Sequence, residues 1–473
     1  MRRKVDVVII GAGSAGVTAL FTLARAGKSF VLINSGEEGS TCTRVGCMPS
    51  KALIEAASLH HARERFDEFG LRGAQGVIVD GPAVLARVRA VRDQLVKGVV
   101  GRYHQIMDDT QFISGHARIV APDCVEVNGE RIEAGAIIIA TGSSPVIPPA
   151  FSELGDALLT TDTLFEQTSL PRSLAVVGLG AIGCEMGQAL ARLGVEVHGF
   201  GGRFIAGVKD PVAAEKVIEL FGREMSITMG ARVVPHLENG QVVIEAGDRR
   251  YTVERVLASL GRRPNIGDLG LENLGIELDE HGIPPFDRET LQIGDLPVYI
   301  IGDANGYRLI LHESADEGQI AALNIIYGKR RPFPRRVRMS VTFTAPQIAS
   351  VGAQLNELDA ETTAIGSASA QMNGRALING DTDGLIRIYA DKQSGRLLGA
   401  SLAIADGEHM AHWLAMAIGQ AMTLDECLTQ PFYHPVIEET LRDALQDCLT
   451  QTELGLPNPP GLMPGVTMLP AAR

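Results

Sequence analysis

The stretch Val5–Gly27, VDVVIIGAGSAGVTALFTLARAG, decides the fold of this chain. Its apolar beginning predicts a short buried strand. Three glycines follow in the order G-x-G-x-x-G, at Gly11, Gly13 and Gly16, and small and apolar residues at helical spacing come after them. Because a strand, a glycine-rich turn and a helix together cradle a pyrophosphate, the stretch predicts a dinucleotide-binding unit.

The same pattern returns at Ser173–Gly194, SLAVVGLGAIGCEMGQALARLG, with its glycines at Gly178, Gly180 and Gly183. In such a unit the first glycine allows the tight turn, and the second lets backbone N–H groups approach the phosphates. The third glycine lets the helix lie close to its strand. One copy of this motif arises easily by chance, but two copies in matching contexts predict a duplicated dinucleotide fold.

A carboxylate is expected about 20 residues after the glycines, where it binds the adenosine ribose. In the first unit the strand FVLINSGEEG has Asn34 at this place, so either Asn34 bonds a hydroxyl or Glu37 reaches back. In the second unit Gly201 replaces the carboxylate, and Arg203 follows two residues later. Since an acid favours NAD and an arginine can meet a 2′-phosphate, the sequence leaves NAD and NADP both open.

Length and composition limit the number of domains, the kinds of partner and the cellular setting that we expect. At about 150 residues per domain, the 473 residues amount to about three domains. The formal net charge of −13 disfavours a nucleic acid or an anionic membrane surface as the main partner. Six cysteines are too few for a disulfide scaffold, and the beginning MRRKVDVVIIG has no small-residue cleavage site after it, so we expect a reducing, cytoplasmic setting. The three glycines of the first turn favour a strand over a membrane span.

A cysteine pair lies in Gly39–Lys51, GSTCTRVGCMPSK, the most specific segment of the chain. On an ideal helix the five-residue step from Cys42 to Cys47 rises about 7.5 Å, which is beyond disulfide reach. The pair can bond only where the backbone is irregular, and a glycine between them and a proline after them predict a loop before a helix starting near Ser50. Thiols at a helix N-terminus have lowered pKa values, which suits thiol–disulfide exchange. The alternative is a pair of small buried residues without a redox role.

Other segments give the outline of the chain. Apolar residues recur at helical spacing over Pro82–Ile106, with Arg92 among the basic residues off this stripe, and predict one long surface helix. Prolines at 145, 148 and 149 and the stretch PFPRR (332–336) mark boundaries, and Leu454–Arg473, rich in proline and glycine, predicts a mobile or surface-hugging tail. The cysteines without metal-ligand spacing, Cys124, Cys427 and Cys448, are predicted to be small buried residues, and His60 and His61 to be solvated.

The order of these motifs resembles the class I pyridine nucleotide-disulfide oxidoreductases, the flavoprotein family that includes dihydrolipoyl dehydrogenase, glutathione reductase and mercuric reductase. The resemblance covers essentially residues 5 to 450. Besides the first glycine motif and the cysteine segment, it rests on AIIIATGSSP (136–145), VLASLGRRPN (256–265), LPVYIIGDAN (296–305) and TFTAPQIASVG (342–352).

The resemblance implies FAD and a nicotinamide nucleotide as cofactors, with NAD expected and NADP not excluded. It implies that Asp303 bonds the FAD ribitol and that Lys51 lies by the flavin ring, paired with Glu185. The implied FAD-binding residues are Gly11, Gly13, Gly16, Asn34, Lys51, Gly115, Gly142, Asp303 and Leu311. The implied nucleotide-binding residues are Gly178, Gly180, Gly183, Glu185, Gly201, Arg203 and Gly261.

The second half of the active site is expected in QPFYHPVIEET (430–440). The family pattern H-P-T-x-S-E keeps its histidine and last glutamate here, as His434 and Glu439, while Val436 and Glu438 replace the threonine and serine. His434 can take a proton from a substrate thiol, and Glu439 can hold the other imidazole N–H. The family supplies this histidine across a two-fold interface, which implies a homodimer. The helix Glu408–Met422, with Trp413, is expected either in that interface or in the ordinary core.

The resemblance implies an α/β fold with two Rossmann-like domains, FAD-binding and NAD(P)-binding, and an α+β C-terminal dimerisation domain. The expected parts are residues 1–148 (FAD-binding, first part), 149–279 (NAD(P)-binding), 280–334 (FAD-binding or central, second part), 335–453 (dimerisation) and 454–473 (tail).

The implied function is that of a dihydrolipoyl dehydrogenase. The partner would be dihydrolipoamide or the lipoyl domain of a 2-oxo acid dehydrogenase-type complex. A divergent NADPH-dependent disulfide or quinone reductase is the alternative. A non-catalytic redox-sensing flavoprotein is disfavoured, because a pure binding module needs none of the reactivity of Cys42, Cys47, His434 and Glu439.

Overall fold

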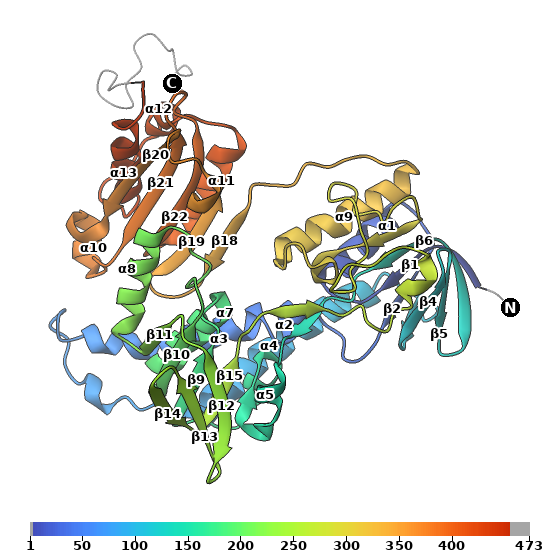
Figure 1. Ribbon diagram of the computed structural model, residues 1–473, viewed down its shortest axis with the longest axis horizontal. Coiled ribbons are helices and arrows are strands. Elements are labelled where there is room, and N and C mark those ends of the chain that lie inside the picture. Colours follow the sequence, from blue (N-terminus) through green and yellow to red (C-terminus); the bar gives the residue numbers. More distant parts are fainter. Residues whose placement is uncertain (1–2, 455–473) are drawn as a thin grey trace. The chain divides into compact units, whose positions relative to one another are not determined.

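The computed structural model describes residues 3–454, which form two compact units (Figure 1). Unit 1 contains the residues up to Ala56, Ile78–Leu170 and Leu260–Arg335. Unit 2 contains Ala57–Val77, Pro171–Ser259 and the residues from Arg336 onward. The expected domain boundaries stay predictions, and the expected tail lies outside the described residues apart from Leu454.

Unit 1 is built on a sheet whose central strands are parallel. Its strands are β1 (Arg3–Ile10), β2 (Phe30–Asn34), β3 (Phe112–Ser114), β4 (Ala117–Ala121), β5 (Cys124–Val127), β6 (Glu130–Ile139) and β17 (Val298–Ile300). The parallel strands lie in the order β3-β2-β1-β6-β17, and β5 and β4 continue from β6 as antiparallel strands. A short antiparallel pair, β7 (Ser143–Pro145) and β16 (Arg262–Pro264), accompanies the sheet.

Helices cover one face of this sheet. The helices assigned wholly to unit 1 are α1 (Ser14–Arg25), α2 (Thr41–Arg44), α4 (Gly81–His104), α5 (Pro149–Ser152), α6 (Thr161–Leu164) and α9 (Leu311–Tyr327). α1 and α9 pack together, and the alternate residues Val7 and Ile9 of β1 join their core. Val8 and Ile10 face the opposite core, beside β4 and β5. Burial on both faces explains the unbroken apolar run of β1.

Unit 2 contains a second parallel sheet and a separate three-stranded meander. The parallel strands are β11 (Ser226–Met229), β10 (Glu196–Gly201), β9 (Ser173–Val177) and β15 (Arg255–Ala258), in this spatial order. The meander consists of β12 (Val233–Glu238), β13 (Gln241–Ala246) and β14 (Arg249–Val253). The helices are α7 (Ala181–Arg192) and α8 (Pro211–Gly222). The predicted strand, turn and helix therefore occur at both glycine motifs.

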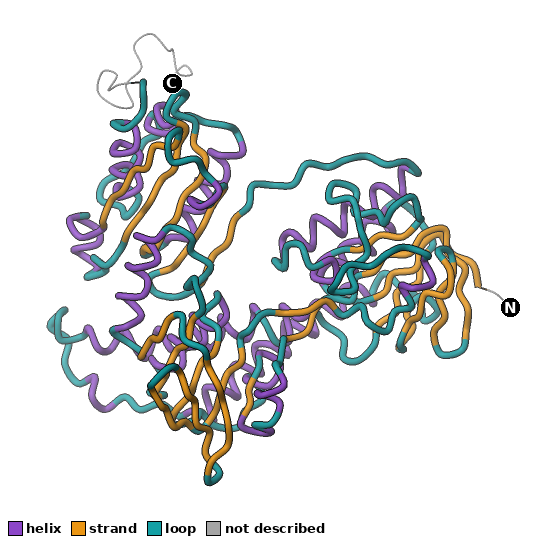
Figure 2. Tube along the Cα trace, viewed as in Figure 1, coloured by secondary structure: helices purple, strands orange, loops and turns teal. Residues whose placement is uncertain are grey.

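The C-terminal part of unit 2 is an antiparallel sheet with helices packed on it (Figure 2). The strands, in spatial order, are β18 (Met339–Thr342), β19 (Gln347–Gly352), β22 (Leu397–Ile404), β21 (Leu385–Asp391) and β20 (Thr363–Ser369). The helices are α10 (Gly374–Asn379), α11 (Gly407–Gly419), α12 (Leu424–Leu428) and α13 (Glu439–Leu449). α11 packs on β19 and β22, and α13 packs on β20 and β21. The expected α/β class with an α+β C-terminal domain is confirmed.

Several local predictions need correction. The long helix expected at 82–106 is α4, but Arg92 is buried against Asp93 and Glu166 instead of lying on the surface. His60 and His61 are half-buried, and His60 Nδ1 lies 2.6 Å from the carbonyl oxygen of Arg192.

The lone cysteines divide into two environments. Cys427 and Cys448 are buried as predicted, and Cys184 is buried as well, whereas Cys124 is only half-buried in β5. Burial raises the pKa of Cys184, Cys427 and Cys448 to about 12.

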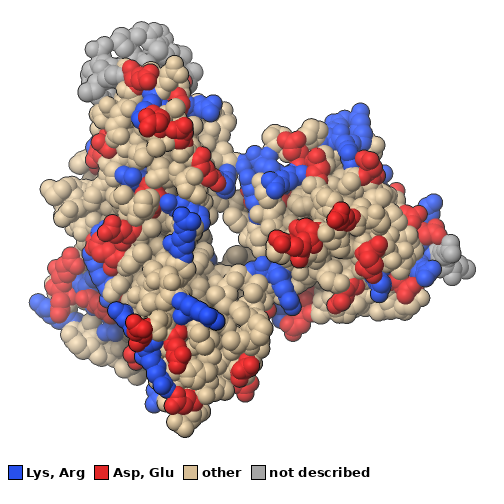
Figure 3. Space-filling view, viewed as in Figure 1, with Lys and Arg blue, Asp and Glu red and all other residues tan. Residues whose placement is uncertain are grey.

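The surface charge and the length of the helices are relevant to two expectations from the sequence, which concern the partner and a membrane span. On the face drawn in Figure 3, acidic and basic side chains lie interspersed over both units. Within residues 3–454, no helix has both the length and the apolar character needed to cross a bilayer.

Candidate active site

The redox loop, residues 39–51, contains the end of one helix, a short break and the start of the next helix. Cys42 lies in α2, and Cys47 is the first residue of α3 (Cys47–Ala62). A Cβ on Gly46 would lie 3.0 Å from the carbonyl oxygen of Thr41 and 3.2 Å from Cys42 Cα. The glycine therefore lets the two helix ends approach, and this is the irregular backbone that the cysteine spacing required. The helix begins three residues earlier than Ser50, because proline is tolerated in a first turn.

The two cysteine side chains are hydrogen-bonded to each other. This hydrogen bond raises the pKa of Cys42, burial and the charge of Cys47 raise it further, and the Lys51 ammonium acts weakly in the opposite direction. Cys42 therefore keeps its proton at neutral pH while it lies against Cys47. Such a pair has the proximity that thiol–disulfide exchange requires.

A cavity of about 550 Å³ opens beside this loop. Its lining residues are Glu37, Gly39, Thr41, Arg44, Val45, Arg92, Asp162 and Glu166. Arg44 forms an ion pair with Glu37, and Arg92 forms one with Glu166. The sequence analysis did not identify Arg44 or Asp162, although the position of Arg44 between the two cysteines was an available signal.

The first glycine motif has the geometry of a phosphate cradle. A Cβ on Gly11 would lie 2.3 Å from the carbonyl oxygen of Ala140, and one on Gly16 would lie 2.0 Å from that of Gly11. A Cβ on Gly13 would meet nothing closer than 3.9 Å. The outer glycines are thus required by packing, while Gly13 leaves the N-terminus of α1 open to an anion.

The second motif repeats this arrangement. A Cβ on Gly178 would lie 2.3 Å from the carbonyl oxygen of Ser259, and one on Gly183 would lie 1.9 Å from that of Gly178. At Gly180 a Cβ would meet nothing within 4 Å. The N-terminus of α7 is therefore open in the same way, and both motifs fit a dinucleotide pyrophosphate.

Around the first cradle, Asn34 Oδ1 accepts a hydrogen bond from the Ala12 N–H at 3.1 Å. Asn34 thus ties the end of β2 to the glycine turn, whereas Glu37 pairs with Arg44. The Gly115 N–H donates to the Asn34 carbonyl at 3.0 Å, which brings Gly115 to the same edge of the sheet. Of the two candidates for binding the ribose, Asn34 is hydrogen-bonded to the glycine turn, whereas Glu37 is held in an ion pair with Arg44.

Beside Gly142, whose φ is +70°, the Thr141 hydroxyl is buried without a hydrogen-bond partner among residues 3–454. An orphaned hydroxyl of this kind fits a polar ligand beside the turn. Gly261 lies near the same segment, because its carbonyl accepts a hydrogen bond from Val146 N–H at 2.9 Å.

Asp303 lies in the short turn Gly302–Asn305 that precedes α9. Its Oδ2 accepts a 2.6 Å hydrogen bond from Ser143 Oγ, and Ser143 Oγ accepts one from Arg262 Nε at 2.8 Å. The turn itself is fixed by Glu317, whose Oε2 accepts from Gly302 N–H at 2.6 Å. Leu311, the first residue of α9, is exposed.

Lys51 and Glu185 belong to different units, and their pairing stays a prediction. Lys51 is half-buried in α3. Glu185 is buried in α7, where its Oε1 accepts a hydrogen bond from Phe343 N–H at 2.9 Å.

At the end of β10, the place of the ribose-binding acid is filled by Met229. A Cβ on Gly201 would lie 2.4 Å from the Met229 sulfur, so a side chain there requires Met229 to move. Arg203 lies over the Phe204 ring at 5.1 Å, and the Lys209 ammonium lies 3.3 Å from the same ring centroid. Burial and the positive charge of Arg203 lower the pKa of Lys209. Lys209 was not identified from the sequence, because it lies six residues beyond Arg203.

His434 and Glu439 form the pair that the motif indicated. His434 Nδ1 lies 3.0 Å from Glu439 Oε2, and the exposed fraction of the side chain is 77% for His434 and 13% for Glu439. Burial opposes ionisation of Glu439, but hydrogen bonds from Val436 N–H and His434, together with Arg442, lower its pKa. Glu439 is therefore a carboxylate at neutral pH and orients the imidazole, leaving Nε2 for a substrate.

Comparisons with known proteins agree with this geometry. Residues 5–320 match the family described as pyridine nucleotide-disulphide oxidoreductase, and residues 339–445 match its dimerisation domain. The chain belongs to this family, in its class I. Members bind FAD and a pyridine nucleotide, so the protein is a flavoprotein disulfide oxidoreductase, and its dimerisation domain supports a homodimer.

Among its relatives are dihydrolipoyl dehydrogenases. That of Chlamydia muridarum is 31% identical over 93% of this chain and 96% of its own length. That of Thermus scotoductus is also 31% identical, over 93% of this chain and 96% of its own. The Geobacillus stearothermophilus enzyme is 29% identical, over 94% and 96%.

Solved structures share the fold. The HOCl-induced flavoprotein disulfide reductase RclA from Escherichia coli gives a TM-score of 0.82 at 24% identity, covering 93% of this chain and 99% of that one. LpdA from Mycobacterium tuberculosis gives 0.81 at 23%, covering 94% and 99%.

Proposed function

We propose that the protein is a dihydrolipoyl dehydrogenase, which oxidises dihydrolipoamide to lipoamide and reduces NAD⁺. The observation that carries the proposal is the hydrogen-bonded pair Cys42 and Cys47 at the break between α2 and α3. The dihydrolipoyl dehydrogenases among its relatives support the same substrate.

The thiol chemistry starts from the oxidised cysteine pair. His434 takes a proton from one substrate thiol, and Glu439 stabilises the imidazolium that forms. The substrate thiolate attacks Cys42 Sγ, so the Cys42–Cys47 bond breaks and Cys47 leaves as a thiolate. The second substrate sulfur then displaces Cys42 from the mixed disulfide and closes the lipoyl ring. The proton that this second thiol loses ends on Cys42, which agrees with the raised pKa of Cys42.

The cofactors would be held by the two glycine cradles. The N-terminus of α1, with Thr141 and Asp303, would hold FAD, and the N-terminus of α7 would hold the nicotinamide nucleotide. FAD, when bound, supplies the transfer of an electron pair from the dithiol to the nicotinamide. Lys51 and Glu185 would lie beside the flavin ring, where they would orient it and supply charges next to it. In the homodimer, His434 would take the proton from a substrate thiol that attacks the cysteine pair of the partner subunit.

One observation favours a second candidate, an NADPH-dependent disulfide or quinone reductase. The end of β10 has Gly201 in place of an acid, and Arg203 and Lys209 place two cations around Phe204. Two cations where the motif has an acid suit a 2′-phosphate better than a free 2′-hydroxyl.

Side-by-side initial rates separate the two candidates. The purified flavoprotein is given dihydrolipoamide with NAD⁺ and, separately, with NADP⁺. Turnover with NAD⁺ supports the dihydrolipoyl dehydrogenase. A preference for NADP⁺, or a flavin that NADPH bleaches without any turnover of dihydrolipoamide, overturns it in favour of the second candidate.

A further inference from the structure

Helix α8 connects the two sheets of unit 2. It packs on β11 of the parallel sheet and on β21 and β22 of the C-terminal sheet (Figure 1). The segment 202–209, which leads into this helix, begins at the carboxyl end of β10, where a Rossmann unit meets the adenosine ribose.

The beginning of α8 is fixed by one carboxylate, that of Asp210, which is fully buried. Its Oδ1 caps the helix by accepting from Val212 N–H at 2.9 Å and Ala213 N–H at 3.2 Å. Its Oδ2 accepts from Arg387 Nε at 2.9 Å and from the Tyr389 hydroxyl at 2.8 Å, both on β21. Burial and the nearby Asp210 raise the pKa of Tyr389, so this hydroxyl remains a donor.

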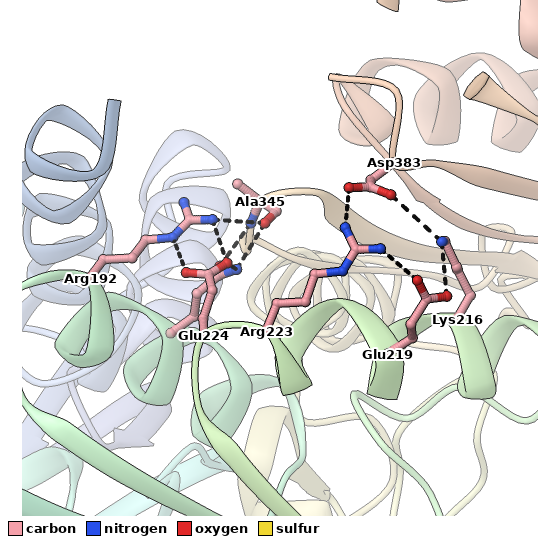
Figure 4. Close-up of polar contacts among 8 residues, drawn as sticks. Arg192, Lys216, Glu219, Arg223, Glu224, Ala345 and Asp383 are labelled. Atoms are coloured by element: carbon pink, nitrogen blue, oxygen red, sulfur yellow. Dashed lines mark hydrogen bonds and ion pairs between the residues drawn. The ribbon is translucent and has the colours of Figure 1, made fainter. Parts of the chain in front are cut away.

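The end of α8 has a second connection of a different kind (Figure 4). Arg223 pairs with Asp383 and with Glu219, and Lys216 lies 3.0 Å from Glu219 and 3.7 Å from Asp383. Arg223, Asp383 and Glu219 are substantially exposed, so their ion pairs contribute little stability. The Asp210 carboxylate is fully buried, and Asp210 follows directly after Lys209 in the chain.

The segment before Asp210 presents cations from a fixed backbone. Ile205 and Val208 are buried, and Ala206 N–H donates to the carbonyl of Leu179 at 2.8 Å. Lys209 thus lies between the buried Val208 and the Asp210 cap, and Arg203, which shares the Phe204 ring with it, lies just before the buried Ile205. Any shift of Asp210 displaces Lys209 directly.

We propose that Asp210 is a positioning residue for the nicotinamide nucleotide: through Arg387 and Tyr389, the C-terminal sheet holds the segment 202–209 in the form that receives the adenosine ribose and its 2′-substituent. The inference rests on the nucleotide site proposed above. It deepens that site, because the affinity for the nucleotide then depends on side chains of β21 that do not touch it.

The test uses substitutions in β21, which leave the helix cap itself intact. Arg387→Met and Tyr389→Phe each remove one donor from Asp210 Oδ2, and Arg223→Met, at the other end of α8, is the matched control. Dissociation constants for NADP⁺ and NAD⁺ are measured by calorimetry on the oxidised holoenzyme. KM for NADH and for NADPH, and kcat with each, are measured with a redox dye as acceptor.

Arg387→Met is expected to weaken binding of the nucleotide that the parent binds more tightly, NAD⁺ or NADP⁺, about tenfold and Tyr389→Phe about threefold, as loss of hydrogen bonds to a charged group implies. The KM for the reduced form of that nucleotide rises in parallel, and kcat stays within about twofold. Arg387→Lys, which keeps a cation, is expected to restore part of the affinity. Arg223→Met binds as the parent does.

Two results overturn the inference: unchanged dissociation constants in Arg387→Met and Tyr389→Phe, or an equal loss in Arg223→Met. If Arg387→Met fails to fold, Tyr389→Phe decides alone, because it removes a single hydroxyl. A parent that binds NADP⁺ but does not oxidise dihydrolipoamide refutes the proposed substrate and leaves this inference standing. A parent that binds neither nucleotide refutes the inference itself.

Discussion

At the scale of single residues, the chemistry depends on the cysteine pair. Replacing Cys47 by serine leaves Cys42 without a disulfide partner, so we expect Cys47→Ser to lower dihydrolipoamide-dependent NAD⁺ reduction by about a thousandfold or more. Cys124→Ser, a change in the half-buried cysteine of β5, is the matched control and should retain parental activity. Equal rates for Cys47→Ser and the parent, with the flavin absorbance retained in both, contradict the disulfide mechanism.

Glu439 acts through the imidazole that it holds. Glu439→Gln removes the carboxylate that orients the imidazole and stabilises the imidazolium formed during proton transfer. We therefore expect kcat/KM for dihydrolipoamide to fall about tenfold. The measurement is the initial rate of dihydrolipoamide oxidation by the variant and by the parent. A parental kcat/KM would exclude Glu439 as the partner of the catalytic base.

The single residues that sequence reasoning identified belong to local motifs. His434 and Glu439 lie five positions apart, and their hydrogen bond could be anticipated from the motif. Lys209 and Arg92 could not be anticipated, because folding brings their partners to them: Lys209 shares a ring with Arg203, and Arg92 pairs with Glu166 in the turn after α6. Pairing across the fold is a property of the packing, which spacing along the chain does not encode.

At the scale of elements, different glycines of the same turn serve packing and ligand binding. Gly180→Ala adds a methyl group that meets nothing within 4 Å, so it should keep the melting temperature and weaken nucleotide binding, because the methyl occupies the approach of the pyrophosphate. Gly183→Ala would place Cβ 1.9 Å from the Gly178 carbonyl oxygen and should lower the melting temperature by several degrees.

Thermal melts of these two variants, and titrations with NAD⁺ and with NADP⁺, provide the check. A fall in the melting temperature of Gly180→Ala as large as that of Gly183→Ala would contradict the division of roles between the two glycines.

A buried ion cluster joins the start of α9 to the segment that follows it. Arg335 bonds Glu317 Oε1 at 2.8 Å and Glu313 Oε2 at 2.6 Å. Although burial opposes it, Arg335 and Arg308 lower the pKa of Glu313, whereas burial raises the pKa of Glu317. Arg335 pairs with both carboxylates, while Glu313 has a second partner in Arg308.

Arg335→Met should therefore cost about 3 kcal/mol or more at neutral pH, since it leaves buried charge unpaired. In the variant Glu317 loses its ion pair, so burial holds its folded pKa still further above the unfolded value; the deficit is full above the folded pKa and shrinks as pH falls toward the unfolded pKa. Urea unfolding of the variant and the parent at neutral and mildly acid pH checks this. A deficit that does not change with pH would show that Arg335 acts through packing alone.

Element types could be read from the sequence better than element limits. The helix expected at 82–106 spans Gly81–His104, because its apolar stripe is long and regular. The start of α3 was placed three residues late, because Pro49 was read as preceding the helix although it lies within the first turn. The expected helix 408–422 is α11, which ends at Gly419, and its Trp413 packs partly buried against the C-terminal core.

At the scale of the whole molecule, the proposed active site needs two chains. Co-expression of Cys47→Ser chains with His434→Ala chains produces hybrid dimers in which one site combines an intact cysteine pair with an intact histidine. We therefore expect two inactive variants to regain activity on mixing, measured as dihydrolipoamide oxidation by the isolated hybrid. A hybrid as inactive as either parent variant would place both halves of the site in one chain.

The fold as a whole was accessible from the sequence, because two copies of one glycine motif and a redox motif specify successive parts of a known architecture. The division into units was less accessible. The second unit combines the second parallel sheet with the C-terminal sheet, through contacts such as those between Asp210 and β21. These contacts join segments about 180 residues apart, and no local sequence pattern predicts them.

The uneven burial of the cysteines has a practical consequence for covalent labelling. Cys184, Cys427 and Cys448 are buried thiols with pKa values raised to about 12, so an electrophilic probe at neutral pH finds almost no thiolate at these positions. In a Cys124→Ser background the redox pair holds the remaining thiols, and because Cys42 keeps its proton beside Cys47, we expect labelling at Cys47. A fluorophore attaches there only when the pair is reduced, so the extent of labelling reports the redox state of the loop in the folded protein.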